Sequence, residues 1–319
     1  MSFFQPAPGT VLSHDIADYP DGIVLPIDKP YRWTSADVIR KVKFAAFRHF
    51  RKKNLKVGHA GTLDPLATGV LLVCLGPACK RAQEFQNHDK EYIASIRFGA
   101  TTPSYDLEKE VDRTFPYDQV TEEAVRAVLP SFLGPQEQVA PLFSAKSVDG
   151  VRAYEMARKL YRNAQKGILD PDFDAAALET LHRSRITISE LELLGFMEAS
   201  AVPEVSDHGA SANGVGQNFY DLFSGEKILV RGVSADAQDN VKSASSRINV
   251  ADTASLGLPE ARIRIACSKG TYIRAFARDL GEALGTGAHL SGLVRTKTGA
   301  FRLEDALSLE EALDLLAAD

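Results

Sequence analysis

The chain has 319 residues, of which 45% are hydrophobic and 25% are charged, which is the profile of a folded globular protein rather than a disordered one. No stretch approaches the roughly 20 apolar residues of a membrane helix, and the N-terminus lacks the basic start and apolar run of a signal peptide. Its three cysteines show no metal-ligand spacing, so we expect buried thiols and a cytoplasmic protein with no membrane partner.

The first predicted element is a short strand at residues 23–27, whose Pro26 suggests a position at the edge of a sheet. Residues 28–33 are predicted to form a loop. Thr34 or Ser35 can then cap a helix in which apolar residues recur every three or four positions.

Residues 58–69 contain three glycines and one proline and show no periodicity, which predicts a shaped loop. The apolar run at 70–75 is a buried strand or a helix, because a run this short does not distinguish the two. Further along, alternating or apolar stretches predict strands, and residues spaced three or four apart predict helices. The expected strands lie at 92–98, 185–195 and 261–267, and the expected helices at 121–129, 152–165 and 271–284.

Between residues 198 and 259 the composition shifts to Ala, Ser, Asp, Gly and Asn, with little apolar periodicity. This composition predicts a mobile insertion. Elsewhere strands and helices mix without regular alternation, which favours an α+β fold over a doubly wound parallel sheet.

A net charge of −5 does not point to a nucleic-acid partner, but salt screens charges beyond about 8–10 Å, so a local patch can act independently of the rest. Residues 40–56 contain no acidic residue. Their cations are Arg40, Lys41, Lys43, Arg48, Arg51, Lys52, Lys53 and Lys56. A plain solvated helix face usually mixes both signs, so this patch favours an anionic partner.

Two residues stand out as candidates for chemistry. Asp64 precedes a proline in the glycine-rich loop, where an aspartate ordinarily forms a turn by accepting backbone N–H bonds. A histidine five positions earlier and the basic patch favour a functional role instead. Arg274 falls in the first turn of the helix expected at 271–284, where a cation opposes the helix dipole. It either snorkels to solvent or pairs with a carboxylate, which it would keep ionised.

The segment Gly58-His59-Ala60-Gly61-Thr62-Leu63-Asp64-Pro65-Leu66-Ala67-Thr68-Gly69 resembles the catalytic motif of the TruB family of tRNA pseudouridine synthases. Ala60 stands where the family often has threonine. Other blocks in the family's order are Asp28-Lys29-Pro30 with Thr34-Ser35, Asp89-Lys90-Glu91-Tyr92, Ser144-Ala145-Lys146 to Ala153-Tyr154-Glu155, Cys267 to Arg274, and Gly287 to Arg295.

The resemblance implies a pseudouridine synthase fold, with a mixed, mostly antiparallel sheet flanked by helices. It implies an isomerase that converts uridine 55 in the T loop of tRNA to pseudouridine by flipping the base out, with no cofactor and no metal. Asp64 would be the catalytic aspartate, Arg274 its ionic partner, and Tyr92 the ring that stacks on the base.

The other residues implied in substrate binding surround this set. Leu293 would line the pocket, and His59 would fill the gap left by the flipped uridine. Lys29 would support the residues that contact the substrate. Lys146 and Tyr154 belong to the segment that would grip the RNA. An ionised Asp64 could attack C1′ or assist removal of a proton from the sugar, and the sequence leaves both routes open.

We expect a single catalytic domain over residues 1–319, with the insertion at 198–259 and without the RNA-binding PUA domain that many relatives carry. We also expect a monomer that binds the T arm of tRNA and requires no protein partner. One alternative is an RNA chaperone without catalysis, which would leave an Asp64–Arg274 pair unexplained. The other is the same chemistry on another RNA, directed by a guide RNA and partner proteins.

Overall fold

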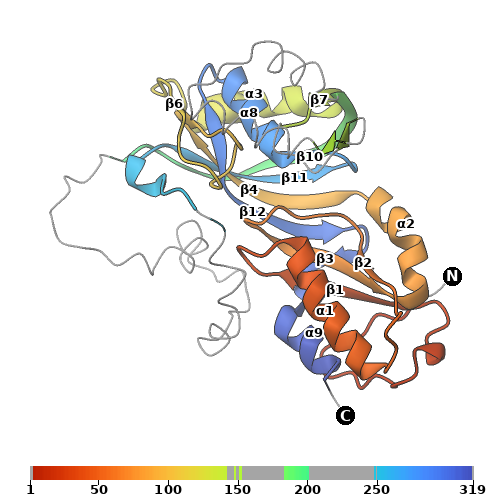
Figure 1. Cartoon of the computed structure of the whole chain (residues 1–319). Helices are drawn as coiled ribbons and strands as arrows, with labels where there is room; N and C mark the ends of the chain where they lie inside the picture. Colours follow the sequence, from red (N-terminus) through yellow and green to blue (C-terminus); the bar gives the residue numbers. More distant parts are fainter. Residues whose placement is uncertain are drawn as a thin grey trace, which may run out of the picture. The chain divides into compact units, whose positions relative to one another are not determined.

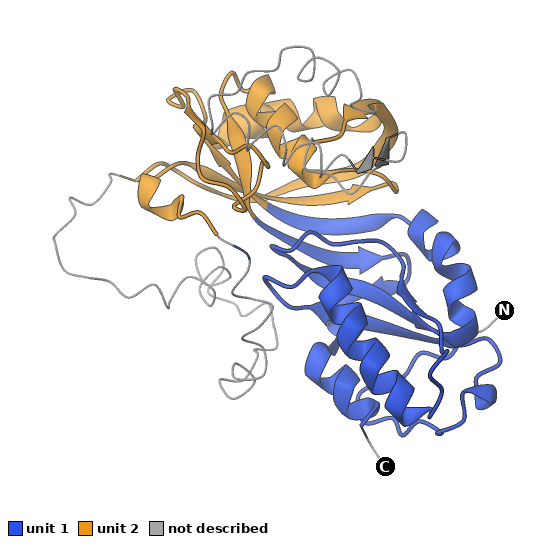
Figure 2. Cartoon of the chain, in the orientation of Figure 1, with its two compact units in different colours: residues 1–94, 202–249, 292–319 blue, residues 95–201, 250–291 orange. Residues whose placement is uncertain are grey.

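The computed structural model describes residues 3–141, 147–148, 151–152, 183–200, 248 and 250–317 (Figure 1). The described residues form two compact units. The first unit comprises residues up to Ala94 and from Gly292 onward, together with Ile248. The second unit comprises residues from Ser95 to Ser200 and from Val250 to Ser291 (Figure 2).

The first unit is built on strands β1, β2, β3, β13 and β14 and on parts of β4 and β12. These strands span Ile23–Lys29, Val57–His59, Ala67–Leu75, Phe301–Arg302, Leu307–Ser308, Lys90–Phe98 and Ala288–Thr298. Its helices α1, α2 and α9 span Ser35–His49, Ala82–Asn87 and Leu309–Leu315. Short 3-10 turns lie at Ile16–Asp18 (η1), Gly76–Arg81 (η2) and Leu303–Asp305 (η6).

The second unit contains the remaining strands and helices. Strands β5, β6, β7, β10 and β11 span Ala100–Thr101, Arg113–Thr114, Gly134–Val139, Arg183–Met197 and Glu260–Cys267, and a small hairpin pairs β8 (Ser147–Val148) with β9 (Val151–Arg152). Helices α3 and α8 span Glu122–Val128 and Ile273–Ala283, with 3-10 turns η3 at Leu129–Phe132 and η5 at Ala254–Leu256.

The strands of the main sheet follow the order β14-β1-β3-β12-β4-β11-β10-β7, with β2 paired to β3 and β13 paired to β12. Pairing is parallel for β1–β14 and β3–β12 and antiparallel for β1–β3, β2–β3, β7–β10, β10–β11 and β12–β13. The expected mixed, mostly antiparallel sheet of an α+β fold is therefore confirmed.

The core of the first unit follows from strand periodicity, because alternate residues face opposite sides of a sheet. On one side Val24, Val70 and Leu72 pack with Phe85 of α2 and Phe301. The other side carries residues such as Leu25 and Leu71, and α9 packs on β1 and against α1 (Figure 1). Because both faces are covered, β3 is buried almost throughout and reads as a continuous apolar run.

Residues 70–75 are therefore a strand, which resolves the alternative that the sequence left open. The edge position predicted for residues 23–27 is wrong, because β1 lies between β14 and β3. Proline is tolerated there for a local reason. The Val24 N–H donates to the Phe4 carbonyl on the outer side of β1, so the Pro26 nitrogen faces the same side, where β14 pairs only with Ile27 and Asp28.

Other boundaries differ by a few residues. The loop predicted at 58–69 is shorter, because β2 extends to His59 and β3 starts at Ala67. The helix expected at 271–284 begins at Ile273, and Gly285 follows it with a positive φ as predicted. The helix expected at 152–165 is wrong at Arg152, which pairs in β9 with Ser147; its remaining residues lie outside the described ones. The residue at which a strand or helix ends depends on its partners in the fold, and local sequence periodicity carries no information about those partners.

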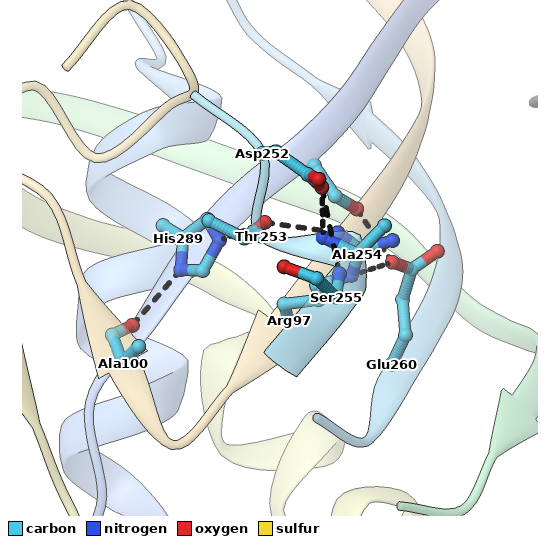
Figure 3. Close-up of polar contacts among 9 residues, drawn as sticks. Arg97, Ala100, Asp252, Thr253, Ala254, Ser255, Glu260 and His289 are labelled. Atoms are coloured by element: carbon cyan, nitrogen blue, oxygen red, sulfur yellow. Dashed lines mark hydrogen bonds and ion pairs between the residues drawn. The ribbon is translucent and has the colours of Figure 1, made fainter. Parts of the chain in front are cut away.

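Residues 250–259 fall within the predicted insertion, but they are packed in the second unit. The Ala251 N–H donates to the Leu107 carbonyl, and the Ser200 N–H donates to the Gly257 carbonyl. The Asp252 carboxylate accepts from the N–H of Ala254, the first residue of η5, at 2.9 Å (Figure 3). The rest of the predicted insertion, apart from 198–200 and 248, lies outside the described residues.

A buried polar network fixes this segment (Figure 3). Nδ1 of the fully buried His289 lies 2.9 Å from the Ala100 carbonyl, and Nε2 lies 3.1 Å from the Thr253 hydroxyl. The Arg97 guanidinium donates to that same hydroxyl at 2.9 Å and pairs with the Glu260 carboxylate at 2.7 Å. A neutral imidazole satisfies the network, with Nδ1–H donating to the carbonyl and Nε2 accepting from the hydroxyl.

The His289 network makes stability depend on pH. Burial lowers the pKa of His289 from 6.5 to about 4, with the Ala100 carbonyl opposing and Arg97 reinforcing the shift. The unfolded chain therefore binds a proton between these values and the folded chain does not, so stability is complete above about pH 6.5 and falls as pH drops toward 4. We expect His289 to account for a loss of about 2 kcal/mol between about pH 7.5 and about pH 5, measured by urea denaturation.

The matched control is His289→Gln, which retains an amide donor and acceptor but does not titrate. Its pH-dependent loss should be smaller than that of the wild type by the same amount. An unchanged pH dependence in His289→Gln would show that other groups cause the loss.

Candidate active site

Asp64 lies in the connection between β2 and β3, at the head of a turn in which the Ala67 N–H donates to the Asp64 carbonyl at 3.1 Å. The side chain is half-buried. The turn delivers the chain directly into β3, which is buried on both faces. A residue at this point is therefore attached to a closely packed strand, which is where a precisely oriented functional group is expected.

One buried polar side chain, Ser35, holds the turn from the side of α1. The Ser35 hydroxyl accepts from the Leu63 N–H at 3.0 Å and donates to the Leu63 carbonyl at 3.1 Å. The helix cap is instead Thr34, which forms a capping box with Asp37. Ser35 is thereby available to fix the backbone immediately before Asp64.

Lys29 holds the residue that follows Asp64. Its ammonium is fully buried and donates to the carbonyls of Trp33, Pro30 and Pro65 at 2.6, 2.9 and 3.1 Å. Three carbonyls match the three N–H donors of an ammonium. The supporting role that the family resemblance implied for Lys29 therefore has a definite geometry, because Lys29 clamps the Pro65 carbonyl.

The charge of Lys29 is coupled to the acids around it. Burial lowers the pKa of Lys29 to about 7, and the negative charges of Asp64 and then Asp28 oppose that shift. The Asp28 carboxylate accepts from the Gly69 N–H at 3.0 Å, while burial raises the pKa of Asp28. An ionised Asp64 thus favours the ammonium form of the side chain that positions it.

Arg295, on β12, holds the turn from that strand, and no role was predicted for it from the sequence. Its side chain is 1% exposed, and its guanidinium donates to the carbonyls of Val70, Gly61 and Thr62 at 2.7, 3.2 and 3.5 Å. A cation within an otherwise buried strand was the signal available in the sequence.

Gly69, paired with Arg295, has φ of +98°, and a Cβ there would lie 2.2 Å from the Arg295 carbonyl oxygen. Only glycine fits at this position.

Leu293 and Tyr92 are the predicted pocket residues of the first unit. Register pairs Leu293 with Ala67, at the end of the Asp64 turn, and Leu293 is half-buried. Tyr92 is 8% exposed on β4, the neighbour of β12 in the strand order. The structure therefore brings Leu293 to the Asp64 turn, while Tyr92 is mostly buried with a small exposed fraction.

His59 ends β2 and is paired with Val73 of β3. Its Nδ1 is buried and has no hydrogen-bond partner among the described residues. Burial lowers the pKa of His59, and the positive charge of Arg295 lowers it further. The imidazole is therefore neutral at pH 7, a form that enters a stack of bases more easily than a charged ring.

Arg274 lies in the second unit, in the first turn of α8, and is 5% exposed. The snorkelling alternative is therefore wrong. Its Nε lies 3.7 Å from an Asp106 carboxylate oxygen, and Nη1 donates to the Ser104 carbonyl at 3.1 Å. The Gln138 amide fixes the start of α8 by bonding both the N–H and the carbonyl of Tyr272. The expected pairing of Arg274 with Asp64 stays a prediction.

Lys146 and Tyr154, the remaining predicted RNA-binding residues, lie outside the described residues. Within the part of the chain that the structure describes, no group of three or more His, Cys, Asp or Glu side chains could hold a metal ion. In the same part, no helix is both long enough and apolar enough to cross a membrane.

Comparison with known proteins identifies the family. Residues 48–167 match the profile of the TruB family pseudouridylate synthase N-terminal domain, and residues 274–319 match the tRNA pseudouridylate synthase B C-terminal domain. Over 293 residues the chain is 42% identical to tRNA pseudouridine synthase B of Bacteroides thetaiotaomicron and 41% identical to that of Phocaeicola vulgatus, with 92% of each chain covered. The chain belongs to the TruB family of tRNA pseudouridine synthases.

A more distant TruB relative, tRNA pseudouridine synthase B of Deinococcus deserti, is 35% identical over 90% of this chain and 77% of its own. The fold is also similar to a chain in the crystal structure of a Cbf5-Nop10-Gar1 complex, with a TM-score of 0.50 and 22% identity. That match covers 92% of this chain and 54% of the other, so this chain spans about half of its length. The α+β fold is thus that of the pseudouridine synthases, and the TruB family consists of isomerases that act on RNA.

Proposed function

We propose that this protein isomerises uridine 55 in the T loop of tRNA to pseudouridine and that Asp64 carries the chemistry. The observation that supports this proposal most is the convergence of buried Ser35, Lys29 and Arg295 on the backbone around Asp64. An ordinary surface turn does not need three buried polar side chains to hold it. A catalytic carboxylate does, because small errors in its position weaken its effect on the transition state.

The reaction breaks the N1–C1′ bond of uridine, rotates the base within the pocket and forms a C5–C1′ bond. The hydrogen on C5 leaves as a proton, and the detached N1 gains one, so the product is an isomer of the substrate. Asp64 either attacks C1′ as a nucleophile or accepts a proton from the sugar, and both roles require an ionised carboxylate beside the ribose. The detached base must remain in the pocket until it has turned.

The neighbouring residues fit the retention and extrusion of the base. The Tyr92 ring offers a stacking face, an interaction worth about 1–3 kcal/mol per base, and Leu293 supplies an apolar wall. Extruding a base costs a few kcal/mol, part of which neutral His59 would recover by occupying the gap. In the same proposal, the Arg274 guanidinium serves as the ionic partner of the Asp64 carboxylate.

The test uses tRNA transcribed with uridine tritiated at C5, because isomerisation must expel that hydrogen. We expect release equivalent to one uridine per tRNA, and no release from a matched transcript in which cytidine replaces uridine 55. A T-arm hairpin should also be a substrate, whereas ribosomal RNA fragments should not.

The two alternatives give different results in this assay. RNA binding without tritium release would favour a chaperone. Release from ribosomal RNA fragments but not from tRNA would favour the same chemistry on another RNA.

A further inference from the structure

The outer face of α1 and the turn after it carry a run of cations with no acidic residue among them in the sequence. All eight cations between residues 40 and 56 are exposed. Among the residues that the structure describes, only Arg40 of these eight forms an ion pair, with Asp37 at 2.8 Å, and that acid precedes the patch. We call this surface, residues 40–56, the basic face. Because it lacks interspersed acids, its field attracts polyanions more than an ordinary solvated helix does.

The basic face contains a pocket. Lys43, Lys53 and Lys56 line an open cavity of about 510 Å³, together with Asn54 and Phe47. The Lys43 ammonium lies 5.4 Å from the centre of the Phe47 ring. No carboxylate lines this cavity. Three lysines and one asparagine around a space of this size suit the phosphodiester groups of a nucleic-acid backbone.

An exposed aromatic ring stands beside the cations. Phe44 is 66% exposed, although it lies on a helix whose inner face is well packed by Val38 and Val42. The Arg48 guanidinium lies 5.9 Å from the centre of the Phe44 ring. Cations interleaved with an exposed ring are typical of surfaces that bind single-stranded nucleic acid, where phosphates meet the cations and a base stacks on the ring.

The pocket is too far from the Asp64 turn to hold the target base. It includes Gly58, which pairs with Cys74 near the end of β3. The Asp64 turn enters β3 at its other end, at Ala67. Seven steps along a strand, at about 3.3 Å each, separate these points by about 23 Å. An RNA that occupied both places would contact the first unit at two separate positions.

We infer that the basic face is a second RNA-binding site, which holds an unpaired segment of the substrate RNA away from the target uridine. Backbone phosphates occupy the pocket of Lys43, Lys53 and Lys56, and one base stacks on Phe44. This inference rests on the proposed function for the identity of the RNA. The site contributes to binding the RNA and does not touch the reacting atoms, so it lowers KM and leaves kcat to Asp64.

The first test replaces Lys43, Lys53 and Lys56 together with alanine. Each lost phosphate contact reduces the slope of log Kd against log salt by about 0.7–0.9, so we expect a reduction of about 2–3. At low salt the KM for tRNA should rise about 10- to 100-fold, while kcat at saturating tRNA changes less than about twofold.

A matched control replaces the exposed Arg113, Arg126 and Arg302 with alanine, which lowers the net charge equally but should leave the salt slope within about 0.5 of the wild type.

The second test uses fluorescence from Phe44→Trp. The chain has a single tryptophan, Trp33, which is 4% exposed, so the new indole dominates any change on binding. Titration with a short single-stranded oligouridylate should quench the emission, and Leu133→Trp, also on an exposed position but in the second unit, should show no quenching. Phe44→Ala should weaken oligouridylate binding about tenfold.

The outcomes separate this inference from the proposed function. If tritium is released from tRNA but the triple variant keeps the wild-type salt slope and KM, the second site is overturned and the enzyme assignment stands. If no tritium is released but the triple variant and Phe44→Ala lose RNA binding, the second site stands and the assignment fails. Unchanged Phe44→Trp emission with bound oligouridylate overturns the stacking role of Phe44.

Discussion

Asp64→Asn is expected to bind tRNA as the wild type does and to release no measurable tritium, with the rate falling about 10³-fold or more. The amide is nearly isosteric with the carboxylate, so the turn held by Ser35, Lys29 and Arg295 should persist. What disappears is the negative charge that attacks C1′ or accepts the sugar proton. The measurement is single-turnover tritium release at equal RNA occupancy, with Kd determined separately.

A matched control for this variant is Asp28→Asn. Asp28 is another buried acid near the turn, but its carboxylate accepts from the Gly69 N–H and has no proposed contact with substrate. An asparagine oxygen can still accept that bond, so the rate should fall by less than about tenfold. If Asp64→Asn retained more than about a tenth of the wild-type rate, Asp64 would not be the catalytic residue.

Arg295→Leu is expected to lower the free energy of unfolding by about 3–5 kcal/mol. Removing the guanidinium leaves the buried carbonyls of Val70, Gly61 and Thr62 without their donor. The kcat of the folded enzyme should also fall about 10- to 100-fold, because the Asp64 turn loses one of its three anchors. Urea denaturation measures the first effect, and tritium release at saturating tRNA measures the second.

Arg302→Leu serves as the control for Arg295→Leu. Arg302 lies on β13, where it is paired with Lys297 of β12, but its side chain is exposed and Glu304 is 3.7 Å away. Its loss should therefore change the free energy of unfolding by less than about 0.5 kcal/mol. Arg295→Lys should fall between the wild type and Arg295→Leu, because one ammonium cannot reach all three carbonyls. A large loss of stability with unchanged kcat would restrict Arg295 to a structural role.

Several elements could be predicted because their signals are local. The helix that begins at Ser35 has a capping residue followed by apolar residues at helical spacing, and it forms where expected. The strand that contains Tyr92 alternates, and it pairs over Lys90–Phe98. Gly285 ends α8 because it accepts a positive φ. Each of these depends on residues within about one turn or one strand, so no distant partner is needed to predict it.

The anchors of the Asp64 turn could not be predicted in the same way. Lys29 and Ser35 are about thirty residues from the turn, and Arg295 is more than two hundred residues away. Their partners are backbone carbonyls and N–H groups, which every residue carries, so no pattern of side chains marks them. Similarly, the sequence offered a solvent-exposed Arg274 as one alternative, whereas Asp106 lies 3.7 Å from its guanidinium in the fold.

The sequence by itself determined the family, because the family motifs consist of residue types in a fixed order along the chain. It also determined the α+β class, because its apolar residues recur at the spacing of strands in some segments and of helices in others. Only the tertiary structure decided that β1 is an interior strand and that three distant polar side chains meet around Asp64. The physical reason is strand register. Pairing β12 in parallel with β3 sets Arg295 beside Gly69 and Leu293 beside Ala67, and a shift of one residue would turn each of these side chains to the other face of the sheet.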